Sequence, residues 1–424
     1  MAQILLKRVR KRRLEQGHPW VYRNEIEEVQ GEPEAGAVVV VKNHQGHDLA
    51  LGFWHPTSQI AVRIASYQTS ERIDRTWLKA KIARAWAYRK RFLAHTEACR
   101  AVYGEADGIP GLIVDKYGEV AVIQILSLAM DIRRDWIVPA LHEVLGVRAI
   151  YERSDAPVRR LEGLEPQVGC VFGECPEEVE IKENGIFFLV DIQEGQKTGH
   201  FFDQRENRAA LAPVVRFGAL EKPRPDLRFR EEWTDKVVVP ESHNTRVGAE
   251  VLDCFSHTGA FALHAVRYGA KHVILVDASE RALQQAKRNA ERNGYSERCE
   301  FVMGNAFDLL REYERNERLF DVVILDPPAF AKNRAAVPSA LRGYKEINLR
   351  GLKLVRPGGF LVTASCSAHV SPDQWRGIVA EAALDARKIL RLVEYRSAAK
   401  DHPQLMGMEE NDYLKFAIFE VQPR

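Results

Sequence analysis

The sequence lacks the features that mark membrane and secreted proteins. None of its apolar runs approaches the roughly 20 residues that a membrane-spanning helix needs, although 46% of its residues are hydrophobic. Its first residues also lack the apolar core and the small-residue cleavage site of a signal peptide. We therefore expect a cytoplasmic protein with no membrane partner. At 424 residues, the chain is long enough for two or three domains.

Cysteine is scarce and scattered. The chain has no CxxC pair and no cysteine–histidine quartet at zinc spacing, and its six cysteines are Cys99, Cys170, Cys175, Cys254, Cys299 and Cys366. We therefore expect reduced thiols and no metal site. A lone cysteine is most often a small buried hydrophobe, so a functional role for any of these thiols needs support from its surroundings.

Charge of one sign is not in excess, because the formal net charge is only +2. Its distribution is uneven. Residues 1–13 carry six basic side chains and no acidic one, and residues 332–356 carry seven basic side chains beside the single acid Glu346. Such clusters predict phosphate contacts, since affinity for a polyanion grows with the number of phosphates neutralised. Two solvated surface faces would have the same composition.

Three regions of the chain differ in their pattern. Residues 1–70 contain β-branched and aromatic runs separated by polar turns, as in a small β-barrel. Residues 71–190 begin with a basic-faced helical pattern and continue as an α+β region. Strand and helix patterns alternate over residues 191–424, which predicts a doubly wound, Rossmann-like α/β domain. The polar, proline-containing stretch 217–247 is interpreted as an insertion or loop.

The first strand of the third region runs into a tight turn within LDCFSHTGAF, residues 252–261. Asp253 ends the strand, but Phe255 and His257 stand where a dinucleotide-binding turn has glycines, which leaves only Gly259. A pyrophosphate needs that open backbone, whereas S-adenosylmethionine carries no phosphate. The turn is therefore better suited to S-adenosylmethionine than to NAD.

Polar residues end the next two predicted strands as well. Asp277 stands where a carboxylate can bind both ribose hydroxyls, and Asn305 and Asp308 follow one strand later, beside the expected adenine. The order and spacing of the series predict a class I S-adenosylmethionine site. Each acid taken alone could instead cap a helix.

Two later motifs bear on the reaction. In LDPPAF, two prolines stiffen the turn that presents Asp326 at the edge of the sheet. One strand later, ASCS carries Cys366. Carbon 5 of a pyrimidine is too weak a nucleophile to take a methyl group unaided. A thiolate that adds to carbon 6 makes carbon 5 reactive, whereas methylation of a nitrogen needs no thiol.

These motifs resemble those of the RlmI-type 23S rRNA cytosine carbon-5 methyltransferases along nearly the whole chain, together with GHPW near the start, GEADGIPGLIVDKYG (104–118), GQKTGHFFDQRENR (195–208) and the late DHP and YLK. GHPWVYRNEI and LGFWHPTSQIAVRI also resemble a PUA-type RNA-binding domain. The resemblance implies a PUA-like domain over 1–70, a central α+β domain over 71–190 and a Rossmann-like methyltransferase domain over 191–424.

The resemblance also implies roles for individual residues. Cys366 would be the nucleophile, and Asp326 would hydrogen-bond the cytosine edge. The residues expected to line the S-adenosylmethionine site are Asp253, Phe255, Gly259, Asp277, Ser279, Asn305 and Asp308, with Lys197, Thr198 and Phe201 folding over it. The implied partner is 23S rRNA or a large-subunit assembly particle, and a homodimer is possible in such proteins.

Three questions stay open at the level of the sequence. Relatives that methylate a guanine nitrogen share DPP-x-F, so a guanine-nitrogen methyltransferase is one alternative. A non-catalytic RNA-binding assembly factor with a vestigial pocket is another. The base that removes the carbon-5 proton is also unassigned: Glu410 and His402 are candidates, and each could equally be structural.

Overall fold

The computed structural model describes residues 1–8, 13–93, 96–217 and 248–424, so the stretch 217–247 that the sequence suggests is an insertion lies almost wholly outside the described residues. The chain forms two compact units. Unit 1 comprises Met1–Glu206 and Ala398–Asp412, and unit 2 comprises Asn207–Ser397 and Tyr413–Arg424. The three-domain division stays a prediction. The return of residues 398–412 to unit 1 is a feature that the sequence did not predict.

Unit 1 begins with a six-stranded sheet, in agreement with the predicted small β domain. Its order is β2-β6-β5-β4-β1-β3, and β1 pairs in parallel with β4. Alternating burial along β4 sends Val39 and Val41 into the core, where Trp54 also packs. The strands are β1 (Gln3–Leu6), β2 (Trp20–Tyr22), β3 (Ile26–Gln30), β4 (Val38–Lys42), β5 (Asp48–Trp54) and β6 (Ile60–Ser66).

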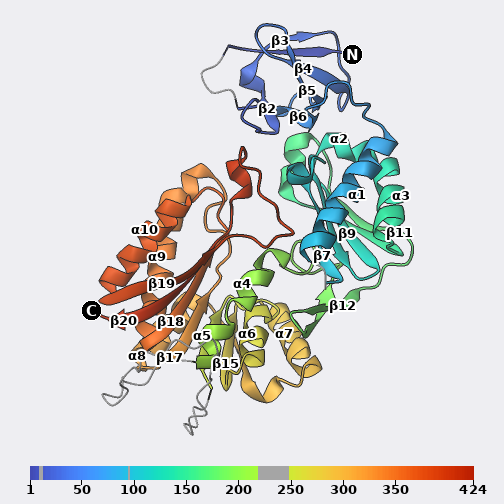
Figure 1. Cartoon of the computed structure of the whole chain (residues 1–424). Helices are drawn as coiled ribbons and strands as arrows, with labels where there is room; N and C mark the ends of the chain where they lie inside the picture. The colour runs from blue at the N-terminus through green and yellow to red at the C-terminus, as the bar shows by residue number, and fades with distance from the viewer. Residues whose placement is uncertain (9–12, 94–95, 218–247) are drawn as a thin grey trace, which may run out of the picture. The chain divides into compact units, whose positions relative to one another are not determined.

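The second sheet of unit 1 carries helices against its core (Figure 1). Its order is β11-β10-β9-β8-β7, and the two-stranded ladder β12-β13 follows. The side chain of Asp74 caps the long helix α1 by accepting from the Trp77 amide. The elements are α1 (Arg75–Phe92), β7 (Ala98–Tyr103), β8 (Leu112–Tyr117), β9 (Val120–Ile125), α2 (Leu128–Asp131), α3 (Arg134–Leu145), β10 (Ala149–Ser154), β11 (Gln167–Phe172), β12 (Glu178–Glu183) and β13 (Ile186–Asp191).

The expectation of reduced cysteines throughout is wrong for one pair. Cys170 and Cys175 form a disulfide, with their Cα atoms 5.8 Å apart. The chain turns back directly after β11, and that turn brings the two thiols together, which sequence spacing alone does not reveal. Within the described ranges, no helix is long and apolar enough to cross a bilayer, and no group of three or more His, Cys, Asp or Glu residues could hold a metal ion.

Unit 2 is built on a seven-stranded sheet in the order β16-β15-β14-β17-β18-β20-β19. The first five of these strands are parallel, and β20 is antiparallel to both of its neighbours. The elements are α4 (Arg205–Ala209), which begins at the boundary with unit 1, α5 (Ala212–Phe217), β14 (Glu250–Cys254), α6 (Ala260–Arg267), β15 (His272–Asp277), α7 (Glu280–Arg292), β16 (Cys299–Met303), α8 (Ala306–Arg315), β17 (Phe320–Leu325), α9 (Val337–Leu354), β18 (Val355–Ser365), α10 (Pro372–Asp385), β19 (Lys388–Arg396) and β20 (Lys415–Pro423).

Helices cover both faces of this sheet. Successive strand residues point to opposite faces, so Val251 packs with α5, α6 and α7, whereas Leu252 packs on the opposite core with α8, α9 and α10. Burial on both faces explains why the central strands are continuous apolar runs. The predicted doubly wound α/β fold is confirmed, and its parallel strands bring their carboxyl ends to one edge.

Candidate active site

Three acids stand on adjacent strands at the carboxyl edge of the unit 2 sheet. Asp253 is the penultimate residue of β14, Asp277 is the last residue of β15, and Asp326 directly follows β17. β14 and β17 are neighbours, and the connections that follow them run in opposite directions, from β14 to β15 and from β17 to β18. Doubly wound sheets bind their ligands at such a reversal.

The turn after β14 has an unusual backbone. Phe255 and His257 have φ values of +63° and +49°, which residues other than Gly, Asn and Asp seldom adopt. Asp277 holds this turn, because its Oδ2 accepts a hydrogen bond from the His257 amide at 2.8 Å. Gly259 follows at φ +82°, where a Cβ would come within 3.1 Å of Leu275. Strain of this kind persists where surrounding contacts hold it and is frequent at binding sites.

Asp253 is buried at the same edge, with 1% of its surface exposed. Its Oδ2 accepts a hydrogen bond from the Ala262 amide at 3.0 Å, whereas its Oδ1 has no hydrogen-bond partner in the described part of the chain. Burial raises the pKa of Asp253 well above its ordinary value, and the carboxylates of Asp326 and Asp277 raise it further. A buried carboxyl oxygen without a protein partner calls for a ligand or water.

The other predicted cofactor residues of unit 2 begin helices. Ser279 accepts the Ala282 amide at 3.2 Å as the N-cap of α7, and Asn305 accepts the Phe307 amide at 2.9 Å as the N-cap of α8. The Asp308 side chain is 73% exposed in the first turn of α8. The helix-cap alternative therefore describes Ser279 and Asn305, while the adenine contact of Asn305 and Asp308 stays a prediction.

A row of aromatic rings, whose proximity no sequence pattern reveals, connects the elements of this edge. The ring of Phe307 lies 6.5 Å from that of Phe255 and 6.0 Å from that of Phe330, which in turn lies 4.7 Å from the ring of Tyr344. These rings join the turn after β14, helix α8, the DPPAF loop and helix α9. Tyr344 is fully buried, but Phe255, Phe307 and Phe330 are half-buried and offer stacking surface to flat heterocycles.

The turn of Cys366 meets the DPP turn. Cys366 directly follows β18, which pairs in parallel with β17, and its Sγ lies 3.8 Å from the carbonyl oxygen of Pro327. The thiol is partly exposed, while Ser365 and Ser367 on either side are fully buried. The structure thus places the predicted nucleophile beside the loop that carries Asp326.

Buried side chains hold the Cys366 turn from behind. Ser367 Oγ lies 2.8 Å from the Tyr344 hydroxyl and accepts the Ala331 amide at 3.2 Å. Lys415, fully buried on β20, donates from Nζ to the Ser367 carbonyl at 2.7 Å and to the Tyr413 carbonyl at 2.8 Å. YLK stands out as a motif in the sequence, but its pattern alone indicates no role for the lysine.

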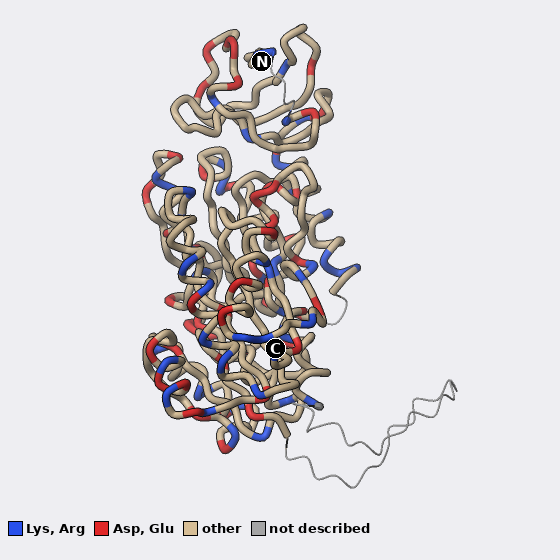
Figure 2. The backbone as a smooth tube through the Cα atoms, turned by 90° about the vertical axis from the view of Figure 1, so that its left-hand side faces the viewer, with Lys and Arg blue, Asp and Glu red and all other residues tan. Residues whose placement is uncertain are grey.

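The basic cluster over 332–356 is mostly paired with acids, and basic and acidic residues are interspersed along the backbone (Figure 2). Its paired members contact acids of neighbouring elements: Lys345 contacts Glu381 and Asp385, Arg350 contacts Glu314 and Glu346, Lys353 contacts Glu314, and Arg356 contacts Glu250 and Asp321. Lys332, Arg334 and Arg342 are exposed. The solvated-face alternative therefore fits much of this cluster.

Three predicted cofactor residues belong to unit 1. Thr198 is fully buried, and its hydroxyl donates to Asp115 Oδ2 at 2.5 Å. Lys197 has a φ of +54°, and its Nζ lies 4.9 Å from the centre of the Phe201 ring. These contacts hold the three residues within unit 1. Their role at the cofactor stays a prediction.

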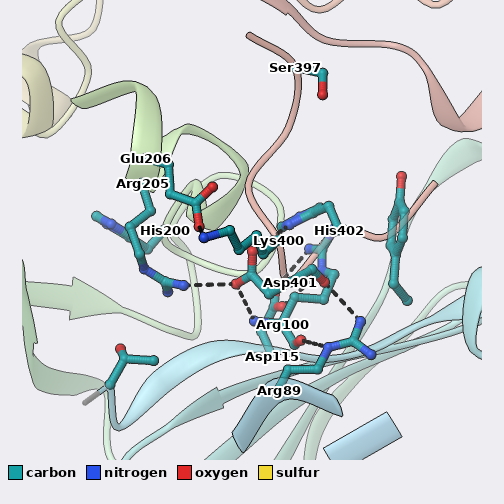
Figure 3. A network of polar contacts seen from close by, with 12 residues as sticks. Arg89, Arg100, Asp115, His200, Arg205, Glu206, Ser397, Lys400, Asp401 and His402 are labelled. Atoms are coloured by element: carbon teal, nitrogen blue, oxygen red, sulfur yellow. Dashed lines mark hydrogen bonds and ion pairs between the residues drawn. The ribbon is translucent and has the colours of Figure 1, made fainter. Parts of the chain in front are cut away.

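Figure 3 shows a buried polar network in unit 1 that centres on Asp401. Asp401 Oδ2 accepts from Arg205 at 3.1 Å and from the Arg100 amide at 3.1 Å, and Arg89 donates to the Asp401 carbonyl at 2.8 Å. Burial alone would raise the pKa of Asp401, but Arg205 and His402 outweigh it and hold this pKa well below its ordinary value. The DHP motif thus ties the returning segment 398–412 to residues of 1–206.

Both candidates for the general base have partners in unit 1. His402 is buried, with its Nδ1 2.9 Å from Asp401 Oδ1. Glu410 lies 3.5 Å from His18 and 3.8 Å from Arg13, and the hydrogen bond from His18 is the main reason that its pKa is lowered. These contacts are sufficient structural reasons for both residues.

The edge of unit 2 fits S-adenosylmethionine. This ligand carries two cationic groups, a ribose and an adenine, but no phosphate. Asp253 has an oxygen without a partner and Asp277 keeps unused lone pairs, so both can accept from a cationic, hydroxyl-bearing ligand. The turn between them has no second glycine for a pyrophosphate.

Comparison with known proteins supports a protein that uses S-adenosylmethionine. Residues 4–67 match the family model of a PUA-like domain, and residues 240–379 match the model named Conserved hypothetical protein 95. A structure from Streptococcus mutans, described as a SAM-dependent methyltransferase, covers 99% of this chain and 100% of its own, with a TM-score of 0.78 and 20% identity. Another methyltransferase structure, complexed with SAH, has a TM-score of 0.79 and 21% identity over 99% of this chain and 100% of its own. The fold is therefore that of SAM-dependent methyltransferases with an N-terminal PUA-like domain.

Relatives of full length identify the family. The chain is 38% identical to the "Ribosomal RNA large subunit methyltransferase I" of Alteromonas mediterranea and 39% identical to that of Shewanella frigidimarina, over 99% of each chain in both cases. The chain belongs to the ribosomal RNA large subunit methyltransferase I family. The predictions of family and fold are confirmed, and the SAH in one structural relative agrees with the predicted cofactor.

Proposed function

We propose that this protein methylates carbon 5 of a cytosine in 23S rRNA, with S-adenosylmethionine as the methyl donor and Cys366 as a covalent catalyst. The observation that carries the proposal is the position of the Cys366 thiol, partly exposed at the end of β18 and 3.8 Å from the DPP loop. The names of the full-length relatives support large-subunit rRNA, or a particle that contains it, as the substrate.

The cofactor supplies a methyl group on a sulfonium, which makes that methyl electrophilic. Asp253 and Asp277 would hold it at the ends of β14 and β15. The thiolate of Cys366 bonds through Sγ to carbon 6 of the cytosine, and the electron pair of the carbon 5–carbon 6 double bond shifts toward nitrogen 3, which takes up a proton at the edge that Asp326 hydrogen-bonds. Carbon 5 then takes the methyl group. A base removes the carbon-5 proton, the double bond re-forms, and the sulfur–carbon bond breaks.

The surroundings of Cys366 suit this role. A thiolate is the reactive form of cysteine, and a nearby cation favours it. Lys415 places an ammonium group on the carbonyl of the residue that follows Cys366. Tyr344 and Lys415 also fix the turn, so that the sulfur is held rather than mobile.

The decisive experiment combines product mapping with a covalent trap. Mass mapping of 23S rRNA treated with the wild-type protein should find a methylcytosine, and Cys366→Ala should form none while binding S-adenosylmethionine within a few-fold of wild type. RNA that contains 5-fluorocytosine should form a stable adduct with the wild type alone, because fluorine at carbon 5 cannot leave as a proton does. Turnover by Cys366→Ala would refute the covalent mechanism.

The same experiment separates the alternatives. A guanine-nitrogen methyltransferase predicts a methylguanine and a dispensable Cys366. A non-catalytic assembly factor predicts RNA binding without any product. The placed thiol and the acids at the sheet edge favour catalysis, because a binding module needs neither.

A further inference from the structure

A groove in unit 1 is not explained by the reaction. It runs beside helix α1, has a volume of about 390 Å³ and continues into a second hollow of about 220 Å³. The two hollows share Ser66, Tyr67, Lys81 and Arg84, so we treat them as one α1 groove. Its walls come from the end of β6, from α1, from the turn at Gly108 and from the returning segment at Leu405.

One face of α1 supplies the side chains of the groove. Lys81, Arg84 and Tyr88 follow one another at helical spacing, and all three line it. Residues three and four apart on a helix lie on one face, so the groove has a row of two cations and an aromatic ring. Tyr67, whose surface is 52% exposed, lies at the end of β6 across from this row.

The cations of this row are not held in ion pairs, although the carboxylate of Glu71 acts electrostatically on Lys81. Lys81 and Arg84 form no hydrogen bond or ion pair with any other described residue, and Lys81 lies 5.6 Å from the centre of the Trp77 ring. Burial lowers the pKa of Lys81, Glu71 opposes that effect, and the charge of Arg84 adds to it. A half-buried ammonium group beside a guanidinium group is a place for an anion.

Two acids of the groove contact basic side chains, although Glu105 shares Arg63 with Glu162. Glu105 accepts from the Trp20 indole at 2.8 Å and from Arg63 at 2.8 Å, and Asp107 accepts from Arg89 at 2.5 Å. Glu71 is a further acid of the lining, in the smaller hollow. Helix α1 itself has no acidic residue, so the wall that it forms is positive.

We propose that the α1 groove binds a single-stranded segment of the substrate RNA, with phosphates on Lys81 and Arg84 and unpaired bases on the rings of Tyr67 and Tyr88. Basic side chains interleaved with aromatic rings suit single strands, because the cations follow the backbone and the rings stack on exposed bases. In a duplex, the bases are stacked on each other, so their faces are not available to the tyrosine rings. The proposal rests on the proposed function, since it takes RNA to be the substrate.

The test measures RNA binding by the full-length protein. The probe is a fluorescent, unstructured pyrimidine RNA of about 12 nucleotides, within the site sizes of single-strand binders, and a duplex of equal length serves for comparison. Lys81→Ala/Arg84→Ala should weaken binding of the single strand about tenfold. It should also reduce the slope of log affinity against log salt by about 1.4, because each phosphate that is no longer neutralised lowers this slope by about 0.7.

Helix α1 also supplies the matched control. Arg75 and Lys79 are exposed on the same helix and form ion pairs with Asp135 and Glu143. Arg75→Ala/Lys79→Ala removes the same charge but should leave both affinity and slope close to wild type. Tyr67→Leu should weaken binding of the single strand several-fold and leave binding of the duplex unchanged. Cofactor affinity should be unchanged in all of these variants.

The outcomes separate the two proposals. If the Lys81/Arg84 variant binds like its control, the groove proposal is overturned, while a Cys366-dependent methylcytosine would leave the proposed function intact. Equal weakening of single strand and duplex by Tyr67→Leu would overturn the assignment to unpaired bases. If the wild type does not bind the single-stranded probe, the groove proposal fails, and product mapping still decides the proposed function.

Discussion

Asp401 in unit 1 and Asp253 in unit 2 are both buried, but they differ in the partners that the protein supplies to them. In unit 1, the carboxylate of Asp401 is buried among Arg100, Arg205 and His402, so the protein itself supplies its partners. In unit 2, Asp253 is equally buried but keeps an oxygen that has no partner among the described residues, and the thiol of Cys366 stays partly exposed. The carboxylates of Asp401 and Asp253 thus differ in what is left for a ligand.

This difference offers a criterion for telling a structural acid from one that is suited to a ligand. A buried charge that protein groups satisfy contributes to the fold and gains nothing from a substrate. A buried polar atom left without a partner is costly unless a ligand completes it. By this criterion, DHP contributes to the architecture of unit 1, whereas Asp253 in LDCFSHTGAF is suited to a ligand. The roles of DPPAF and ASCS at the site stay predictions.

The largest expected effect is on the Asp401 network. Asp401→Asn should lower the free energy of unfolding at neutral pH by about 3 to 5 kcal/mol, because it removes one of the two carboxylates, Asp401 and Glu183, that contact the buried Arg205. The pKa of Asp401 is depressed in the folded protein, so its contribution is present above the unfolded value of about 3.9 and is lost as pH falls below it. Urea unfolding at several pH values measures both.

The control for this variant is Asp373→Asn, which breaks an exposed ion pair with Arg376. It should change the free energy of unfolding by less than about 1 kcal/mol. If Asp401→Asn were as stable as the wild type and lost cofactor affinity instead, the structural role assigned to Asp401 would be wrong. Asp401 would then belong to a site.

The second-largest effect is expected on the rate of methyl transfer when Lys415 is replaced. Lys415→Met should lower the rate of methyl transfer on the order of 100-fold, because it releases the turn that positions Cys366. Loss of the ammonium group should also move the acid limb of the pH–rate profile to higher pH, since the thiolate becomes harder to form. Cofactor affinity should stay within a few-fold.

Lys345→Met is the matched control, because Lys345 forms ion pairs on the surface of α9 with Glu381 and Asp385. It should leave both the rate and the pH profile unchanged. Loss of rate in Lys415→Met without any movement of the pH profile would limit Lys415 to a purely mechanical role.

A smaller effect is expected at Asp253. Its pKa is raised in the folded protein, so stability without cofactor should fall as pH rises from about 4, the unfolded value, through the folded one. Asp253→Asn keeps an acceptor for the Ala262 amide and cannot ionise, so its stability should not fall in this pH range. At pH values above the folded pKa of Asp253, the free energy of unfolding of the variant should exceed that of the wild type by about 1 to 3 kcal/mol.

The same variant should bind S-adenosylmethionine less tightly, because the cationic ligand loses a carboxylate. Titration calorimetry and thermal unfolding over a range of pH test the two halves of this prediction. A variant that gained stability and kept full cofactor affinity would show that the partnerless oxygen has no part in the site.

The alternation of apolar strands and amphipathic helices was enough to predict the fold of unit 2. Burial on both faces of a parallel sheet requires that pattern, and an acid at a strand end needs no long-range information to be placed at the sheet edge. The approach of Cys366 to the DPP loop follows from the same logic, because β17 and β18 are neighbours.

What the sequence did not reveal depends on partners far away along the chain. Asp401 is separated from Arg205 by 196 positions, and no local pattern signals that pairing. Lys415 in a strand would ordinarily indicate a solvated face, yet its ammonium group finds two buried carbonyls. The Cys170–Cys175 disulfide likewise depends on how the chain turns after β11.

The smallest expected effect is at Glu410, and it sharpens the comparison because Glu410 is a candidate for both a structural and a catalytic role. The side chain of Glu410 is 40% exposed beside His18 and Arg13, so Glu410→Gln should change the free energy of unfolding by less than about 1 kcal/mol. If its role is structural, methyl transfer should stay within a few-fold of wild type at every pH. A collapse of the rate with unchanged cofactor affinity, together with accumulation of the covalent RNA adduct, would identify Glu410 as the base. The adduct would accumulate because, without a base, the carbon-5 proton cannot leave after the methyl group has been transferred.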